Sequence, residues 1–182
     1  DLRVLSNFGL DVKNVKNYMD EFNMHVKYPK NPHHYPLIYA LAKSINAKTI
    51  VETGVGMGCS TYTFLLSLDI KGRLYSIDVK KDVGQMVPSH LREKWRLFVG
   101  DSLVILPKLL DSLGEIDIFF HDSVHTEVHQ LLEYSIAWKH LRSGGLLISD
   151  DVTEALPIFS RIVKSKATVF GNRLGVMRKQ VC

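Results

Sequence analysis

Short apolar runs alternate with amphipathic stretches along most of the chain. Five of these runs have the length and the continuous hydrophobicity of buried strands, at 48–53, 73–78, 96–100, 116–121 and 145–150. The stretches between and after them predict helices at about 60–69, 83–94, 102–113, 126–141 and 152–164. Apolar strands that alternate with helices are typical of a parallel sheet covered on both faces. We therefore expect an α/β fold.

The two ends of the chain depart from this alternation. Residues 10–23 carry apolar side chains at a helical period and predict an amphipathic helix, and a second helix is expected at about 37–45. Residues 28–37 between them predict a loop, because three prolines in eight residues remove backbone donors and restrict their neighbours. Residues 167–180 predict two short strands joined around 171–174, which form a hairpin.

Length and composition predict one globular unit. The 182 residues suit a single domain, 1–182, whose N-terminal helical segment and loop occupy 1–36. No apolar run approaches the roughly 18 residues that cross a bilayer, and the first residues lack the pattern of a secretory signal. We therefore expect a cytoplasmic protein with no membrane partner.

The net charge and the cysteine content exclude few classes of binding partner. The net charge of +4 permits contact with an anionic partner, but the lysines and arginines are scattered along the sequence. Cys59 and Cys182 form neither a C-x-x-C metal pair nor a disulfide framework, and both are expected to be reduced.

Polar residues follow the last apolar position of every predicted strand. Ligands of open parallel sheets bind beyond the carboxyl ends of the strands, so these residues are the candidates for a binding site. They are Glu52 to Gly58, Asp78, Gly100 to Ser102, His121 to Ser123, and Asp150 with Asp151.

Three alternate glycines follow the first strand. Gly54, Gly56 and Gly58 would let the backbone turn sharply and approach a ligand closely. The spacing differs from the dinucleotide pattern G-x-G-x-x-G, because Cys59 stands where the third glycine would be. The carboxylate of Glu52 would repel a pyrophosphate and attract an ammonium or sulfonium group. The alternative is a tight strand-to-helix turn without a ligand.

At this point the sequence resembles a known family. "VETGVGMGCST" is similar to the first motif of the class I S-adenosylmethionine-dependent methyltransferases, and "LYSID", "VGDSLVILPKL", "IDIFFHDSVH" and "LRSGGLLISDD" follow in the family's order. The resemblance covers a core of 48–180 and implies a Rossmann-like seven-stranded sheet, with five parallel strands and a C-terminal antiparallel hairpin. The last two segments resemble most a small subgroup with D-x-x-H after strand 4 and a paired acid after strand 5.

The resemblance implies which residues bind S-adenosylmethionine. Asp78 would accept the ribose hydroxyls, Asp101 and Ser102 would meet the adenine edge, and Glu52 would face the methionine portion together with the glycines. The expected cofactor-binding set is Glu52, Thr53, Gly54, Gly56, Gly58, Ser60, Thr61, Asp78, Gly100, Asp101, Ser102 and Asp122. For Asp78, helix capping is the alternative role.

The acids after strands 4 and 5 are candidates for the acceptor end. Asp122, Asp150 and Asp151 could converge as oxygen ligands of Mg²⁺ or another divalent ion. Catechol-type O-methyltransferases resemble this arrangement, although an asparagine commonly follows their aspartate where this chain has a second acid. The alternative is that Asp150 or Asp151 caps the helix that begins near Val152.

Histidines near the same strand end are candidates for the general base. We expect a catalytic group of Asp122, His125 and His121, in which a neutral imidazole takes the acceptor's proton. A local hydrogen-bonding role is the alternative for His125. His129 lies one turn further on and is expected at the surface.

The expected function is methyl transfer from S-adenosylmethionine to an oxygen atom of a small molecule. The alternatives are an RNA methyltransferase, which the basic charge would suit, and a non-catalytic nucleoside-binding module of the same fold. An oxidoreductase that binds NAD is a distant further alternative. The fourth strand is not followed by [ND]PP[YFW], the motif of enzymes that methylate base amino groups, so nucleic acid is the less favoured partner. A second subunit could complete the acceptor pocket, which would make the protein a homo-oligomer.

Overall fold

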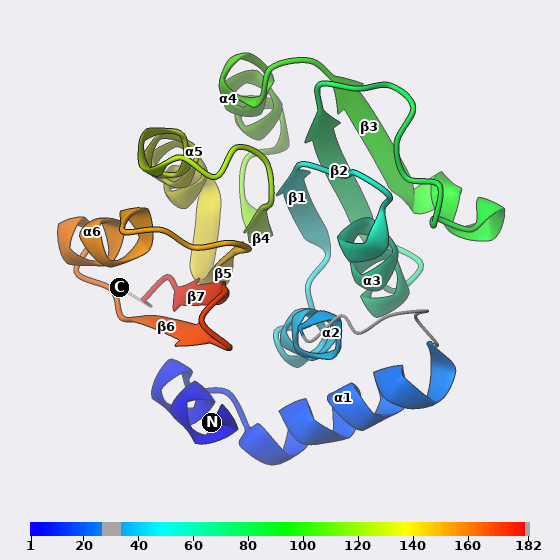
Figure 1. Cartoon of the computed structure of the whole chain (residues 1–182). Coiled ribbons are helices and arrows are strands. Elements are labelled where there is room, and N and C mark those ends of the chain that lie inside the picture. The colour runs from blue at the N-terminus through cyan, green and yellow to red at the C-terminus, as the bar shows by residue number, and fades with distance from the viewer. Residues whose placement is uncertain (27–33, 181–182) are drawn as a thin grey trace.

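The computed structural model describes residues 1–26 and 34–180, and in them a seven-stranded sheet of order β3-β2-β1-β4-β5-β7-β6. Strands β1 to β5 pair in parallel, and β7 pairs antiparallel with both β5 and β6. The expected parallel sheet with a C-terminal hairpin is confirmed (Figure 1). The strands are β1 Thr49–Thr53, β2 Arg73–Asp78, β3 Trp95–Val99, β4 Ile116–His121, β5 Leu141–Ser149, β6 Ala167–Phe170 and β7 Leu174–Arg178.

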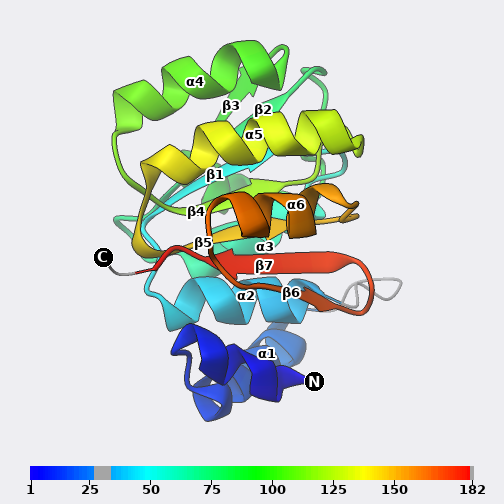
Figure 2. The same cartoon turned by 90° about the vertical axis from the view of Figure 1, so that its left-hand side faces the viewer.

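Helices cover both faces of this sheet (Figures 1 and 2). On one side, α2 and α3 pack against the strands, and α1 lies against the outer side of α2. On the other side lie α4, α5 and α6. These helices are α1 Val12–His25, α2 Tyr35–Ser44, α3 Cys59–Ser67, α4 Ser102–Leu113, α5 Glu127–His140 and α6 Ala155–Ile162, and two 3₁₀ helices occupy Leu2–Phe8 and Ser89–Lys94.

Alternate side chains of the central strands serve two separate cores. In β4, Ile118 and Phe120 pack into the core beneath α2 and α3, whereas Phe119 packs into the core beneath α4, α5 and α6. Both sets are buried, which explains why these strands read as continuous apolar runs rather than as alternating ones.

The prediction of a helix at 83–94 is wrong. Only the 3₁₀ helix Ser89–Lys94 forms there, and residues 82–88 are irregular, with short bends and a turn. The backbone of this segment pairs with the glycine loop instead, since Gly84 N–H donates to Gly56 O and Met86 N–H donates to Met57 O. Pro88, which lacks an N–H, stands just before the 3₁₀ helix.

Two further elements differ from the sequence-based expectation. Strand β5 begins at Leu141, four residues before the expected start, and the 3₁₀ helix Leu2–Phe8 was not expected. The loop predicted at 28–37 lies largely outside the described residues. Among the residues that the structure describes, no helix has the length and apolar character needed to span a membrane.

Glu52 anchors the start of α3 from inside the sheet. Its side chain is fully buried at the end of β1 and accepts hydrogen bonds from Ser60 Oγ at 2.5 Å, Thr61 Oγ1 at 2.8 Å and Ser76 Oγ at 2.7 Å. Burial raises the pKa of Glu52 from its ordinary value of 4.5 to about 7, against the opposing effect of these hydroxyl groups. The carboxyl group of Glu52 therefore ties β1, β2 and α3 together below the glycine loop.

The turn after β1 presses against the turn after β4. Gly54 has a φ of 82°, and a Cβ built there would lie 1.9 Å from the carbonyl oxygen of Asp122. Gly56 also has a positive φ, of 52°, but a Cβ there meets no described atom within 4 Å. Gly54 is thus required by close approach as well as by conformation, whereas Gly56 is required by conformation alone.

Gly54→Ala is expected to lower the free energy of unfolding more than Gly56→Ala, by about 2 kcal/mol or more. Both substitutions place a Cβ on a left-handed backbone, but only the first also forces the Cβ into the Asp122 carbonyl. Urea unfolding of the two variants measures the difference. Equal losses of stability would show that the two turns are not in the contact described.

Glu52 should make stability fall as the pH rises. The folded protein holds a proton on Glu52 up to about pH 7, whereas the unfolded chain loses it near 4.5. Between these values the folded state binds more protons, so the free energy of unfolding decreases with rising pH, by up to about 3 kcal/mol. Glu52→Gln removes this contribution, and the difference in stability between variant and wild type should change across that interval. Chemical unfolding at several pH values tests this, with the exposed Glu115→Gln as control; a constant difference for Glu52→Gln would contradict it.

Candidate active site

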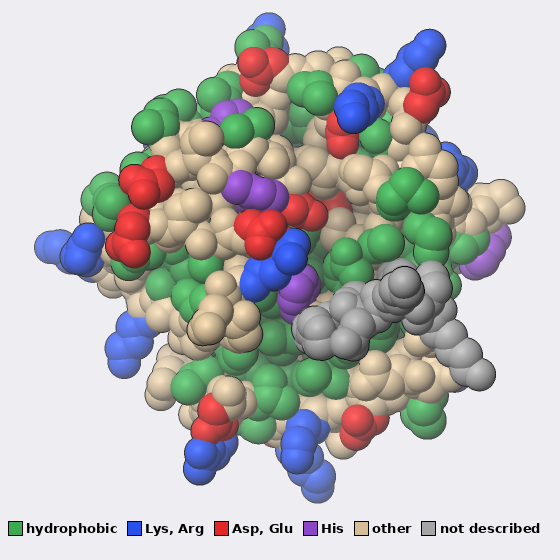
Figure 3. Space-filling model, in the orientation of Figure 1, with side chains coloured by type: hydrophobic (Ala, Val, Ile, Leu, Met, Phe, Trp, Pro, Cys, Tyr) green, Lys and Arg blue, Asp and Glu red, His purple; other side chains and the backbone are tan. Residues whose placement is uncertain are grey.

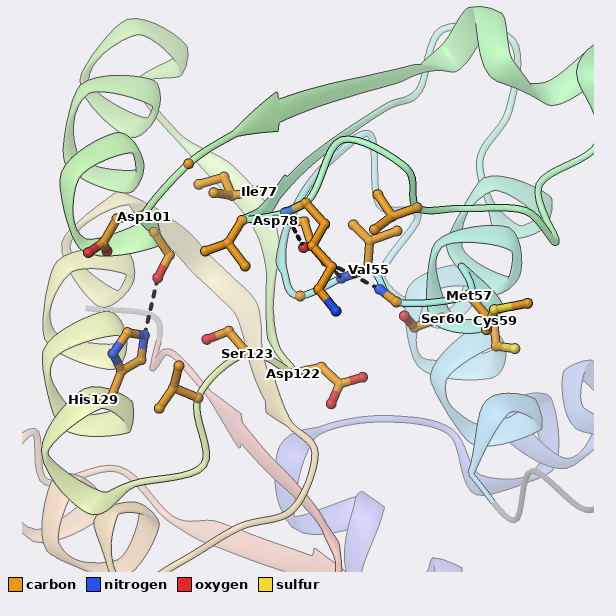
Figure 4. A pocket seen from close by; sticks show the side chains of 18 of the residues that line it. Val55, Met57, Cys59, Ser60, Ile77, Asp78, Asp101, Asp122, Ser123 and His129 are labelled. Atoms are coloured by element: carbon orange, nitrogen blue, oxygen red, sulfur yellow. Dashed lines mark hydrogen bonds between the residues drawn. The ribbon is translucent and has the colours of Figure 1, made fainter.

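A cavity of about 810 Å³ opens at the carboxyl edge of the sheet (Figures 3 and 4). Its walls come from the loop between β1 and α3, the ends of β2 and β3, the turn after β4, and α5. The residues that line it are Tyr35, Gly54 to Met57, Cys59, Ser60, Ile77 to Lys80, Val83, Gly100 to Ser102, Asp122 to Val124, and His129.

Backbone hydrogen bonds hold these strand ends side by side. Gly54 N–H donates to Ile77 O, and Gly100 N–H donates to Asp78 O. In the same way Asp122 N–H donates to Thr53 O, and Asp150 N–H donates to His121 O. The parallel ladder thus continues past the ends of the strands, and the candidate residues of neighbouring strands meet at one edge.

About half of the predicted site residues line this cavity. They are Gly54, Gly56, Ser60, Asp78, Gly100, Asp101, Ser102 and Asp122. The other predicted site residues do not line it: Glu52, Thr53, Gly58, Thr61, His121, His125, Asp150 and Asp151. Glu52, expected to face the ligand, is instead turned toward the hydroxyls of α3 and β2.

Asp78 joins the cavity wall to the glycine loop. Its Oδ2 accepts hydrogen bonds from the backbone N–H groups of Val55 at 2.9 Å and Gly56 at 3.3 Å, and its Oδ1 accepts one from Lys80 N–H at 2.9 Å. Asp101 lies on the opposite side of the cavity in Figure 4, where its Oδ1 caps α4 through Leu103 N–H. Two carboxylates thus stand on the wall, each fixed by backbone donors.

A buried glutamate that the sequence analysis did not single out supports one side of the cavity. Glu133, on the inward face of α5, is fully buried and accepts hydrogen bonds from Ser123 Oγ at 3.0 Å and His129 Nε2 at 2.9 Å. Ser102 Oγ donates to it as well and lies 3.1 Å from His129 Nε2. His129, expected at the surface, therefore lines the cavity; its i,i+4 spacing to Glu133 was the available signal.

The other side of Glu133 reaches into the sheet. Its Oε2 accepts hydrogen bonds at 2.6 Å from Thr53 Oγ1 and from His121 Nδ1. Burial alone would raise the pKa of Glu133, but the hydrogen bond and charge of His121, with the hydroxyl donors, outweigh it and hold the pKa at about 2. His121 is fully buried, and its Nε2 has no hydrogen-bond partner among the described residues.

Acidic and basic side chains alternate outward from the Asp122 end of the cavity. His125 Nε2 lies 3.4 Å from Asp122 Oδ1, and His125 Nδ1 lies 3.6 Å from Asp151 Oδ2. Arg173 Nε then lies 2.9 Å from Asp151 Oδ1. Arg173 also donates to both oxygens of Asp150, at 2.8 and 2.9 Å. Figure 3 shows acidic, basic and histidine side chains gathered together on this face.

This arrangement shifts the protonation of its members. Burial raises the pKa of Asp122. The hydrogen bond to Asp122 raises the pKa of His125, although partial burial opposes it. Burial would raise the pKa of Asp150, but the hydrogen bond and charge of Arg173 outweigh it and lower that pKa.

The three acids expected to hold a divalent ion do not fit such an ion as they are placed. Both oxygens of Asp150 are engaged by a guanidinium, and one oxygen of Asp151 lies against the same group. Within residues 1–26 and 34–180, no group of three or more His, Cys, Asp or Glu side chains is arranged to hold a metal ion.

Comparison of the sequence with known proteins gives related enzymes. The probable caffeoyl-CoA O-methyltransferase 3 of Dictyostelium discoideum is 29% identical over 119 residues, which are 62% of this chain and 47% of that protein. The chain spans about half the length of the curated relatives it matches.

Solved structures share the fold. A methyltransferase from Geobacter sulfurreducens superposes with a TM-score of 0.67 at 23% identity, covering 92% of this chain and 89% of that one. The O-methyltransferase TomG from Streptomyces achromogenes, solved in complex with S-adenosylmethionine, superposes with a TM-score of 0.66 at 21% identity. The superposition covers 93% of this chain and 89% of TomG.

Residues 51–152, more than half of the chain, match a protein family described as a methyltransferase domain. This segment runs from β1 through β5 and contains every strand end that borders the cavity. The chain belongs to this methyltransferase-domain family.

Proposed function

We propose that the protein is an S-adenosylmethionine-dependent methyltransferase that acts on a small molecule at an oxygen atom. The observation that carries the proposal is the single cavity at the carboxyl edge of the sheet. It brings the glycine loop, Asp78 and Asp101 to one space, with Asp122 at its end. Family membership and the oxygen-directed relatives support the same reaction class.

The cavity wall offers groups suited to each part of the ligand. The carboxylate of Asp78 would accept the two ribose hydroxyls, and Asp101 with Ser102 would meet the adenine edge. The methionine portion would then lie along Gly54 and Gly56, near Asp122. A negative carboxylate at that end favours the ammonium and sulfonium charges.

Asp122 and His125 are the proposed acceptor-side pair. Their spacing follows the D-x-x-H pattern after strand 4, and the 3.4 Å contact between them orients the imidazole. Bound S-adenosylmethionine would supply an electrophilic methyl group on its sulfonium, suited to in-line attack by the acceptor oxygen with the thioether as leaving group. The residues of this chain align the acceptor, and His125 takes its proton.

The acceptor itself is proposed to be a hydroxyl-bearing small molecule. A relative named for caffeoyl-CoA supports this class, and caffeoyl-CoA is the first compound to assay. Transfer of a radiolabelled methyl group from S-adenosylmethionine to a panel of hydroxyl compounds tests the proposal. Transfer to nitrogen acceptors or to RNA alone would contradict it.

Asp78→Ala is expected to weaken binding of S-adenosylhomocysteine by about tenfold or more, because two ribose hydroxyls lose their charged acceptor. Asp82→Ala, at an exposed aspartate in the loop that follows β2, is the matched control and should bind as wild type does. Calorimetric titration measures both. No heat with the wild-type protein at millimolar ligand would contradict cofactor binding altogether.

His125→Ala is expected to lower kcat by about 10² to 10⁴-fold with an accepted hydroxyl substrate, because the proton acceptor is lost. Binding of S-adenosylhomocysteine should remain, since His125 does not line the cavity. His90→Ala, at an exposed histidine of the 3₁₀ helix Ser89–Lys94, is the control. Unchanged turnover in the His125 variant would remove this residue from the mechanism.

A further inference from the structure

The turn between β6 and β7 fixes the backbone of Arg173 over the acidic strand end. Gly171 and Asn172 both adopt a positive φ, of 59° and 57°, and Arg173 N–H donates to Phe170 O at 3.2 Å. Arg173 O in turn accepts a hydrogen bond from Val152 N–H at 3.2 Å. The hairpin is therefore tied to the same loop that carries Asp150 and Asp151.

Asp151 is held toward Arg173 by a strained backbone. Its φ of 44° is unusual for a residue other than glycine. The fully buried side chain of Gln130 donates from Nε2 to Asp151 O at 3.0 Å and secures this conformation. The carboxylate of Asp151 then lies between the guanidinium of Arg173 and the imidazole of His125.

The pairing of Arg173 with Asp150 has the geometry of a strong interaction. Two parallel N–H groups meet two carboxylate oxygens, and the Asp150 side chain is only 7% exposed. His34 Nε2 approaches the same carboxylate at 3.5 Å. A divalent ion would need these oxygens at about 2.1 Å and would meet the like charge of the guanidinium beside them.

We propose that the guanidinium of Arg173 stands where a divalent ion would otherwise bind, so that the acceptor end of this site works without a metal. The inference deepens the proposed methyl transfer and rests on it. A metal would hold the acceptor oxygen and stabilise its negative charge as the proton leaves. A fixed guanidinium supplies the same positive charge through hydrogen bonds.

Arg173 retains a hydrogen-bond donor that could contact the acceptor oxygen. Its side chain is half exposed, and its Nη1 makes no hydrogen bond to any residue that the structure describes. The other two nitrogens are committed to the carboxylates. Arg173 therefore acts first as a positioning residue for Asp150 and Asp151, and it presents its remaining N–H groups to the oxygen of an acceptor.

Titration with Mn²⁺ followed by electron paramagnetic resonance tests the proposal without any need for turnover. The wild-type protein is expected to bind Mn²⁺ no more tightly than about 1 mM. Arg173→Ala, which leaves Asp150 and Asp151 without their guanidinium, should bind it at least about tenfold more tightly. Arg161→Ala, at an exposed arginine of α6, is the matched control and should behave as wild type does.

Two further variants show whether the gained Mn²⁺ binding comes from the acids that Arg173 contacts. The double variant Arg173→Ala with Asp150→Asn should lose the gained Mn²⁺ binding, which would show that Asp150, once freed of its guanidinium, is a ligand. Arg173→Gln replaces the alanine variant if the latter does not fold, as judged by circular dichroism.

Either of two results would overturn the proposal. One is Mn²⁺ binding by the wild-type protein at micromolar concentration that Asp150→Asn abolishes. The other is a folded Arg173 variant that gains no binding. Calorimetry with S-adenosylhomocysteine on the same samples tests the proposed function separately, because we expect cofactor binding not to depend on Arg173. Cofactor binding by all variants would leave the proposed function standing even where the Mn²⁺ results overturn the role of Arg173.

Discussion

The candidate site depends on backbone hydrogen bonds that carry the parallel ladder beyond the strand ends. Through them, Gly54, Asp122 and Asp150 each donate to the neighbouring strand, and the turns that follow come within contact of one another. The missing side chain at Gly54 allows this approach, because a Cβ there would collide with the Asp122 carbonyl. The cavity is thus a consequence of strand register, and residues far apart in the sequence reach it together.

Charge divides this edge of the sheet into two regions with different roles. Glu133 and His121 form a buried pair that supports the wall through Ser102 and His129, and none of this pair faces the cavity directly. Asp122 opens an exposed series of alternating acids and bases that ends at Arg173. The buried pair therefore shapes the wall of the cavity proposed to hold the cofactor, and the exposed series is proposed to contact the acceptor.

The sequence predicted the strands well because their signal is local. The bounds of β2 and β4 agree residue for residue, since each is an apolar run that ends at a polar side chain. The prediction of a helix at 83–94 was wrong because the backbone of this segment pairs with the glycine loop. Such a contact between segments far apart in the sequence leaves no periodic pattern. Glu133 and Arg173 escaped notice for the same reason: on a helix or in a turn, a charged residue ordinarily indicates a solvated surface.

A crystal structure with S-adenosylhomocysteine would test the central claim most directly. We predict adenine beside Asp101 and Ser102, ribose at Asp78, and the sulfur atom near Asp122 at the end of the glycine loop. Ligand density at any other place on the protein, or an empty cavity at saturating ligand, would contradict it.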